Sequence, residues 1–339
     1  MQERPITPLE RVFEDGVLID LDISIWTMET RMKPEDLGLD PDAVVEVFRL
    51  GKKLLLPAEA RNRFRRIESR ARYRIEQVSF AFPISQARFV PKRALPELLE
   101  DLEELREEFN SEVDRFVEDY EALKEKIRPH YIEAAEHAWT NSHSSLSLDE
   151  FVRKFLDRLD SLYPQPNEVR SRFDFSYHVF EVQMPREHRS PETLSAEERA
   201  RREAERRMLE QLQTQYSQRI NTFLETVVTT LRQRTAELCQ HVAEKIRNGE
   251  AISERTLKSM REFVAKFRTL NFVGDQQIEA MLENLEKRFL SNPASLYNSD
   301  GLFNMRSELE AALKQITDTA TDLSDISRIT GDYKRRLLI

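Results

Sequence analysis

The sequence predicts a mainly α-helical fold (α+β), in which long helical hairpins or a bundle lie beside a small antiparallel sheet of two or three strands. Three observations lead to this fold class. Only seven of the 339 residues are glycine, whereas average usage gives roughly 24. Charged residues make up 33% of the chain, which suits long helices with solvated outer faces. Apolar residues recur every three or four positions over long stretches, which is the period of a helix.

Three stretches instead alternate with the period of two that is typical of a half-buried strand. Residues 17–26 place Ile19, Leu21, Ile23 and Ile25 on one side, and Asp20, Asp22 and Ser24 on the other. Residues 78–82 and 173–182 alternate in the same way. We therefore expect two or three strands, with helices elsewhere.

Capping signals and apolar periodicity predict where the helices begin and end. Prolines favour the first turn of a helix, and Ser-x-x-Glu forms a capping box. From Leu98 an apolar stripe predicts a helix of about 30 residues. The longest helix is expected from about Ala196 to Asn248, ended by Gly249, with shorter helices near 254–270, 275–290 and 302–325. The expected starts follow Pro41, Pro57, Pro96, Pro129, Ser147 and Ser195.

The seam of the longest helix repeats every eleven residues, which predicts nearly straight or weakly right-handed packing. Residues 185–194 are polar, carry two prolines and form the expected linker. We therefore expect an α+β domain at 1–184 that carries arginine-rich and acidic helices, and a helical domain at 195–339. The seam residues are Leu209, Leu212, Tyr216, Ile220, Phe223, Val227 and Leu231.

An arginine-rich segment is the most strongly charged candidate for a binding site. Residues 61–74 hold seven arginines and one glutamate, a local charge of +6, whereas residues 97–121 hold twelve carboxylates and two arginines, a local charge of −10. Pairing of these two faces in a hairpin is the simpler interpretation. A basic face that binds an acidic partner protein or the phosphates of a nucleic acid is the alternative. The candidate residues are Arg61, Arg63, Arg65, Arg66, Arg70, Arg72 and Arg74.

Two aspartate motifs resemble parts of known sites without the fold that those sites need. Asp20 and Asp22 end an apolar strand, as in haloacid dehalogenase-like phosphatases, where the first carboxylate attacks phosphorus. Asp275 and Glu279 would then be Mg²⁺ ligands. That fold needs five or more parallel strands, so a helix N-cap at Asp275 is the simpler interpretation. Asp22-x-Ser24 also resembles the adhesion motif of von Willebrand A domains, but its third position is Trp26.

Metal and thiol chemistry have weak support in the sequence. His130, Glu133 and His137 share one helix face, and His143 follows, but no second ligand cluster is evident. Cys239, the only cysteine, lies within an apolar stretch and is expected to be a buried side chain. We therefore expect no catalytic residue, no metal and no cofactor. Without a signal peptide or an uncharged apolar stretch of 18 residues, the chain is expected to be cytoplasmic, with no membrane partner.

Three segments together resemble the bacterial, phage and plasmid domain-of-unknown-function family 3150. They are GVLIDLDISIWT, then LGKKLLLPAEARNRFRRIESRARYRIEQVSFAFP running into LLEDLEELREEFN, and FRTLNFVGDQQIEAML. The resemblance supplies no catalytic signature. It implies an adaptor role beside a MoxR-type AAA+ ATPase or a von Willebrand A protein, encoded on mobile genetic elements.

The expected function is that of a non-enzymatic interaction, scaffold or adaptor protein, because the apolar seams are continuous and no catalytic set converges. A seam left uncovered within the chain would favour a homo-oligomer. Nucleic-acid binding through the arginine-rich helix is the alternative, and a Mg²⁺-dependent phosphatase is third. The net charge of −9 disfavours nucleic-acid binding by the whole surface.

Overall fold

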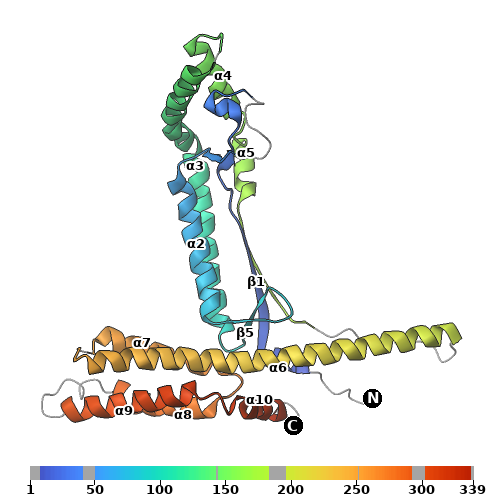
Figure 1. Cartoon of the computed structure of the whole chain (residues 1–339), viewed down its shortest axis with the longest axis vertical. Coiled ribbons are helices and arrows are strands. Elements are labelled where there is room, and N and C mark those ends of the chain that lie inside the picture. The colour runs from blue at the N-terminus through green and yellow to red at the C-terminus, as the bar shows by residue number, and fades with distance from the viewer. Residues whose placement is uncertain are drawn as a thin grey trace. The chain divides into compact units, whose positions relative to one another are not determined.

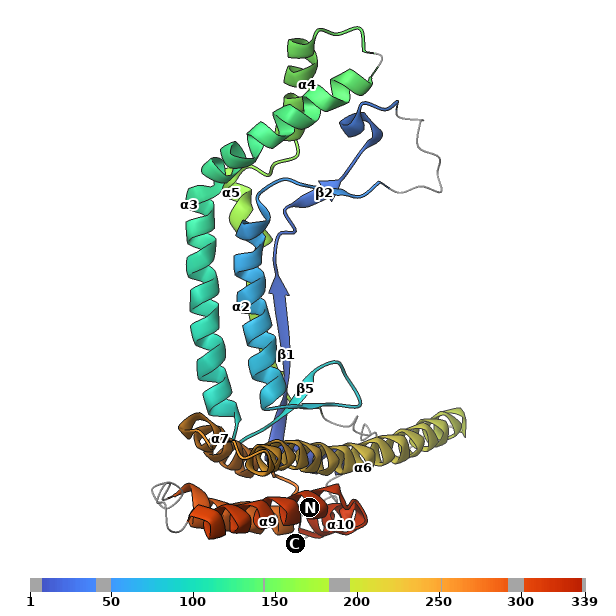
Figure 2. The same cartoon turned by 60° about the vertical axis from the view of Figure 1, so that its left-hand side comes forward.

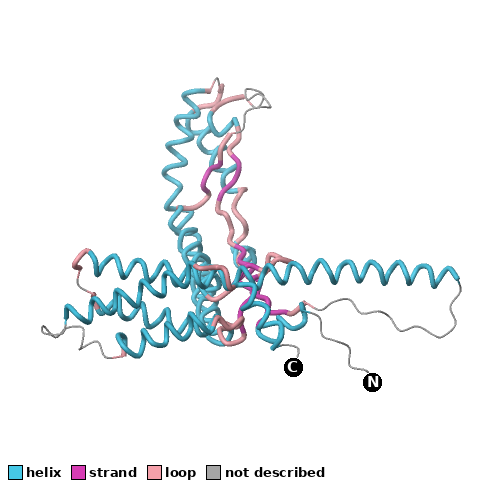
Figure 3. The backbone as a smooth tube through the Cα atoms, turned by 60° about the horizontal axis from the view of Figure 1, so that its bottom comes forward, coloured by secondary structure: helices cyan, strands magenta, loops and turns pink. Residues whose placement is uncertain are grey.

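A computed structural model describes residues 8–40, 50–142, 144–182, 196–250, 252–291 and 302–336. Helices make up most of this part of the chain (Figure 3). A small antiparallel sheet accompanies them. The predicted fold class, mainly α with some β, is therefore confirmed. The Pro41 and Ser195 helix starts and the linker at 185–194 lie outside the described residues.

The sheet has four strands within the described residues, more than the two or three that the sequence predicts. Strand β1 pairs antiparallel with β5, with Gly16 opposite Pro91 and Ile19 opposite Arg88. Strands β2 (Glu29–Arg31) and β3 (Lys52–Leu54) form a separate pair. The missed strands are only three or four residues long, too short for a period of two to stand out. The main sheet has the order β4 (Phe80–Ala81), β5 (Arg88–Pro91), β1 (Gly16–Ser24), β6 (Asp174–Phe180).

The contacts divide the chain into two compact units, each built from separate stretches of sequence. Unit 1 comprises Met1–Asp20, Ile75–Leu98 and His178–Ile339. Unit 2 comprises Leu21–Arg74 and Leu99–Tyr177. The chain therefore passes between the units four times, twice within strands β1 and β6.

Unit 1 is built around helix α6 (Ala196–Arg247), which lies alongside α9 (Leu302–Thr321) in Figure 1. Its aromatic core includes Phe89, whose ring centroid lies 5.3 Å from that of Phe223 and 5.1 Å from that of Phe272. These rings pack the strand β5 against α6 and the turn before α8. The remaining helices of unit 1 are α1 (Pro8–Asp15), α7 (Glu254–Leu270), α8 (Gln276–Leu285), the π-helical turn η4 (Glu286–Leu290) and α10 (Ile326–Arg336).

Unit 2 is built around α2 (Ala58–Gln77) and α3 (Leu95–Asn141), most of whose residues belong to it. Phe64 of α2 stacks on Phe173 with centroids 4.6 Å apart, and both rings contact Phe116 of α3. This aromatic cluster is the core of the unit. The shorter elements are the 3₁₀ turn η1 (Pro34–Leu37), α4 (Leu148–Asp160), α5 (Pro166–Val169) and the 3₁₀ turn η3 (Arg170–Arg172).

Most described helix ends agree with the sequence signals. Ser147 accepts a hydrogen bond from the backbone N–H of Glu150 and caps α4, as predicted. Gly249 follows α6 with φ of 72°, the left-handed conformation expected of a terminating glycine. The predicted 302–325 helix ends at Thr321, and α10 was not predicted.

The helix start at Pro129 was wrong, because α3 continues through this residue to Asn141. A proline inside a helix removes one backbone hydrogen bond and bends the helix, but packing on both sides keeps it continuous. Figure 2 shows α3 bent along its length. Buried side chains at Ile127 and Tyr131 flank the proline. The tertiary contacts therefore override the local signal.

Candidate functional site

The arginine-rich helix α2 is largely paired within its own unit. Of its seven candidate arginines, five form ion pairs with carboxylates. Three of these pairs join α2 to α3, as the hairpin interpretation predicts: Arg63–Glu112 at 3.1 Å, Arg70–Glu108 at 2.7 Å and Arg74–Asp101 at 3.5 Å. Residue numbers rise on one helix as they fall on the other, so the two helices run antiparallel.

Arg61 makes the most buried ion pair of this helix. Its guanidinium donates to a Glu29 carboxylate oxygen and, over 3.1 Å, to the carbonyl oxygen of Thr27. Hydrogen bonds from Arg61 and then Lys52 lower the pKa of Glu29 below its usual value. Arg72 pairs with Glu68 on its own helix at 2.9 Å. Arg61 therefore has a clear structural role, which fixes the start of α2 against β2.

Arg65 and Arg66 make no ion pair with any residue that the structure describes, and both are exposed. Tyr73, seven residues after Arg66 on the same helix, has 58% of its surface exposed. Residues at i and i+7 lie on the same face of a helix. Arg66 and Tyr73 thus form a basic and aromatic solvent face on α2, with Arg65 beside it.

Helix α3 carries a complementary acidic solvent face. Glu100, Glu104, Glu107 and Glu118 are all exposed and form no ion pair within the described residues. They recur at spacings of three, four and eleven, which keeps them on one face of the helix. Buried side chains such as Leu102 and Phe109 occupy the opposite face. This acidic face adjoins the seam of ion pairs with α2.

The first half of α6 packs little of its surface within unit 1. Only the end of this half meets the loop at Pro83, whose carbonyl oxygen accepts a hydrogen bond of 3.5 Å from Arg219. In Figures 1 and 3 no other described helix or strand of unit 1 runs along this half. Met208 has 62% of its surface exposed, and Leu209, Leu212 and Tyr216 are half-buried. From Ile220 onward the same seam is buried, with Ile220 itself fully covered. We call residues 203–219 of this half the α6 arm.

The motif at Asp275 is the centre of a buried ion-pair cluster. Asp275 caps α8 by accepting a hydrogen bond from the backbone N–H of Ile278. Its carboxylate also accepts, over 2.6 Å, from the guanidinium of Arg232, whose side chain is only 1% exposed. Arg232 reaches Asp325 at 2.7 Å and also donates to the carbonyl oxygen of Asp322. The N-cap interpretation of Asp275 is confirmed, and its carboxylate is occupied by these bonds.

The cluster keeps the Arg232 side chain charged despite its burial. Burial alone lowers the pKa of a guanidinium, but the hydrogen bonds to Asp275 and Asp325 outweigh it and raise the pKa of Arg232. Glu279, the second candidate Mg²⁺ ligand, accepts a hydrogen bond of 2.8 Å from the Asn271 side chain. That amide also accepts from the backbone N–H of Asp275 at 2.8 Å. Helices α6, α8 and α10 are thereby joined through one arginine.

The remaining candidate chemical groups are dispersed. Asp20 and Asp22 are exposed on β1, on the outward side that the alternation predicts. His130, Glu133 and His137 are exposed on α3, and His143 lies outside the described residues. No group of three or more metal-ligating side chains occurs among the residues described. Burial raises the pKa of the Cys239 thiol to about 12, so this side chain is the buried apolar group that the sequence predicts.

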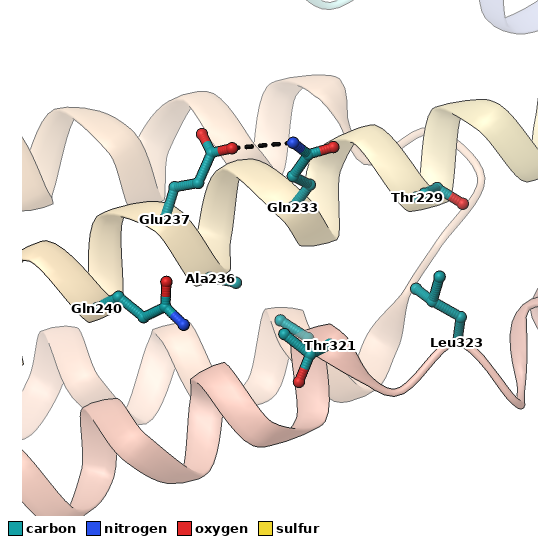
Figure 4. A pocket seen from close by; sticks show the side chains of 8 residues that line it. Thr229, Gln233, Ala236, Glu237, Gln240, Thr321 and Leu323 are labelled. Carbon is teal, nitrogen blue, oxygen red and sulfur yellow. Dashed lines mark hydrogen bonds between the residues drawn. The ribbon is translucent and has the colours of Figure 1, made fainter.

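A shallow pocket of about 310 Å³ opens between α6 and α9 in unit 1 (Figure 4). Its α6 side presents Gln233, which donates a hydrogen bond of 2.9 Å to Glu237. Leu323, 48% exposed, lies at its other side beside Thr321. No titratable group other than Glu237 lines it, so the pocket offers contact area without an evident reactive pair.

The comparisons with known proteins place the chain in one family. The family model described as "Protein of unknown function (DUF3150)" matches residues 13–315, and the chain belongs to this family. No curated protein and no solved structure matches it. No helix in the described part of the chain is long and apolar enough to cross a membrane.

Sequence reasoning missed two prominent features of the structure, the buried Arg232 cluster and the exposure of the α6 arm. Arg232 was not singled out, although it shares a helix face with Val228, Thr235 and Cys239, all buried. The available signal was that Arg232 occupies a position where the spacing of the neighbouring apolar residues predicts burial. The α6 arm was included in the seam, but its exposure depends on which partners the rest of unit 1 supplies.

Proposed function

We propose that the protein is a non-enzymatic interaction or scaffold protein whose partner docks along the α6 arm. The observation that carries this proposal is the partly exposed apolar seam of the arm. Most helix stability in proteins comes from packing an apolar face and not from intrinsic propensity. An apolar stripe that unit 1 leaves partly exposed, with Met208 beside it at 62% exposure, supports a missing partner.

The spacing of the seam favours a helix as the docking element. Leu209, Leu212 and Tyr216 are separated by three and four residues, the spacing that packs side chains of one helix between those of another. The flanking charges form pairs within the arm itself, Arg206–Glu210 at 3.1 Å and Arg207–Glu203 at 2.7 Å. A partner helix with an apolar stripe and no strong net charge therefore fits the arm best.

We further propose that this partner is a subunit of a MoxR-type AAA+ ATPase, with the present chain as its adaptor. The support for this finer proposal is the resemblance to the family. A von Willebrand A protein is a second partner in the same assembly. Homo-oligomers through the arm are the outcome to be distinguished by experiment.

Nucleic-acid binding through α2 is the weaker alternative. Five of the seven arginines already have carboxylate partners, and the acidic face of α3 lies beside the two that do not. A nucleic acid that followed α2 would run beside these carboxylates, where like charges repel. The observations therefore favour a protein partner.

Site-specific photo-crosslinking in the native host tests the proposal. A photoreactive amino acid at Met208 lies beside the seam, next to Leu209, whereas one at Thr214, exposed on the opposite face, is the matched control. The proposal predicts that Met208 crosslinks to an AAA+ ATPase and Thr214 does not. Equal labelling from both positions, or crosslinks from Met208 only to further copies of this chain, would contradict it.

A substitution provides the second readout. Leu212→Glu places a charge in the half-buried seam and should abolish co-purification of the ATPase, whereas Thr214→Glu adds the same charge outside the seam and should leave it unchanged. Circular dichroism checks that both variants keep their helix content. Retention of the ATPase by folded Leu212→Glu protein would remove the arm as the docking surface.

A further inference from the structure

We propose that this chain forms a two-fold dimer through the solvent faces of α2 and α3, with α2 of one copy lying against α3 of the other. This surface is separate from the α6 arm. The partner is a second copy of the chain, and the argument rests on the charges that the two helices expose beside each other.

Two stripes of opposite charge run along the same pair of helices. On α2, the exposed Arg65 and Arg66 have no carboxylate partner among the described residues. On α3, Glu104 and Glu107 likewise have no ion pair. Along the helices, both sets lie between the same two ion pairs that join α2 to α3, Arg63–Glu112 and Arg74–Asp101. A basic stripe and an acidic stripe are therefore fixed side by side at one level.

This arrangement selects the kind of partner that fits. A polyanion would be attracted to the basic stripe of α2 and repelled by the acidic stripe of α3. A purely basic protein would be attracted to α3 and repelled by α2. A partner that satisfies both stripes must itself carry an acidic stripe beside a basic one. A second copy of the chain carries both stripes, because its surface is the same.

Two-fold symmetry brings the stripes into register. Rotation by half a turn about an axis parallel to the two helices places the basic stripe of one copy over the acidic stripe of the other, and does the same for the second pair. Each contact then occurs twice, as in any isologous interface. Tyr73, with 58% of its surface exposed, provides the apolar contact that charged stripes alone lack.

The association should be weak and strongly dependent on salt. Exposed ion pairs contribute only about 0–1 kcal/mol each, and salt screens them. We expect the mass from light scattering or sedimentation equilibrium to approach that of two chains at about 0.05 M salt, and to fall to that of one chain at about 0.5 M salt.

Charge exchange tests the geometry directly. Arg65→Glu with Arg66→Glu should leave the protein with the mass of one chain at low salt, and so should Glu104→Arg with Glu107→Arg. An equimolar mixture of these two variants should regain the mass of two chains, because both sets of contacts are then restored. Arg153→Glu with Lys154→Glu, on the exposed face of α4, makes the same change in charge elsewhere and should leave association intact.

The remaining outcomes each overturn the proposal. A wild-type protein that stays a single chain at low salt excludes the dimer. Association that survives both exchanges, or that is lost in Leu212→Glu protein instead, places the interface elsewhere. Binding of a single-stranded oligonucleotide that the Arg65 and Arg66 substitutions abolish, without self-association of the parent, assigns the stripe to nucleic acid. Crosslinking from Met208 is independent of all of these results.

Discussion

At the residue scale, the most consequential side chain of unit 1 is Arg232. Taking a charge out of water is costly, and the structure compensates with two carboxylates and a carbonyl oxygen. These partners come from the start of α8 and the connection into α10, which are far apart in sequence. The cluster thus stabilises the arrangement of three helices within the unit.

Removing the Arg232 side chain should strongly destabilise unit 1. Arg232→Met leaves the buried Asp275 without its cation, whereas Asp325 keeps Arg328 at 3.0 Å, and breaking a buried pair in this way costs about 3–5 kcal/mol. Urea unfolding followed by circular dichroism measures the change. Arg255→Met, at an exposed position of α7, should change the free energy of unfolding by less than about 0.5 kcal/mol.

Urea unfolding also distinguishes the two roles of Asp275, which are to cap α8 and to pair with Arg232. Asp275→Asn keeps a good N-cap and removes the charge, whereas Asp275→Ala removes both, so Ala should cost about 1 kcal/mol more than Asn. Equal losses for these two substitutions would contradict the capping role.

Buried tyrosines should make the protein sensitive to alkali. Burial raises the pKa of Tyr120 and of Tyr131 to about 12, and each hydroxyl donates to a backbone carbonyl oxygen, that of Pro164 and that of Leu54. Because the folded pKa exceeds the unfolded value near 10, this stabilisation is fully present below pH 10 and is lost as pH rises towards 12.

Ultraviolet absorbance of the phenolate checks this expectation. The buried tyrosines should ionise only as circular dichroism reports unfolding, and Tyr131→Phe should remove part of the alkaline loss of stability. Complete ionisation of all eight tyrosines while the helices remain intact would contradict their burial.

At the scale of elements, the sequence predicted well those helix ends that depend on neighbouring residues, and predicted poorly those features that depend on tertiary packing. The N-caps at Ser147 and Asp275 and the terminator at Gly249 depend on neighbours within a few residues, so the pattern alone was sufficient. Pro129 carried an equally clear local signal, but its outcome depends on packing against the rest of unit 2. The short strand β5 has only four residues and gains its structure from pairing with β1.

Glycine substitutions should differ in cost according to what surrounds each residue. Gly38 has φ of 74°, and a Cβ there would lie 2.0 Å from the carbonyl oxygen of Ala138. Gly38→Ala should therefore cost about 2–5 kcal/mol, from backbone strain plus overpacking. At Gly249 a Cβ would meet nothing within 4 Å, so Gly249→Ala adds only the backbone strain of a positive φ and should cost about 1–2 kcal/mol.

Thermal unfolding of the two variants, with Gly51→Ala as a control, tests this order. A Cβ at Gly51 meets nothing within 4 Å, so that variant should be close to neutral. A Gly38→Ala protein as stable as Gly51→Ala would show that the η1 segment does not pack against α3 as described.

At the scale of the whole molecule, the sequence predicted the fold class and the family, but could not predict how the chain is divided between units. Hydrophobic periodicity reports which face of an element is buried and not what buries it. Unit 1 takes up residues 75–98 from the middle of the chain, between two stretches of unit 2. The predicted boundary at 185–194 lies outside the described residues and stays a prediction.

The candidate site was predictable only in part for the same reason. The hairpin pairing of arginines and carboxylates followed from the opposite local charges of residues 61–74 and 97–121. Which arginines stay unpaired depends on the register of α2 against α3, which no single sequence supplies. The exposure of the α6 arm likewise depends on where α9 ends its contact with α6.

Hydrogen–deuterium exchange along α6 tests the central claim, that the arm is a docking surface for a partner protein. In the protein alone, amides of residues 203–219 should exchange faster than those of residues 220–247, because the latter pack along their length within unit 1, whereas the arm meets unit 1 only at its end, near Pro83. Addition of the ATPase should slow exchange at 203–219 and leave 220–247 unchanged. Equal protection of both halves in the protein alone, or no change at 203–219 on addition of the ATPase, would contradict the account.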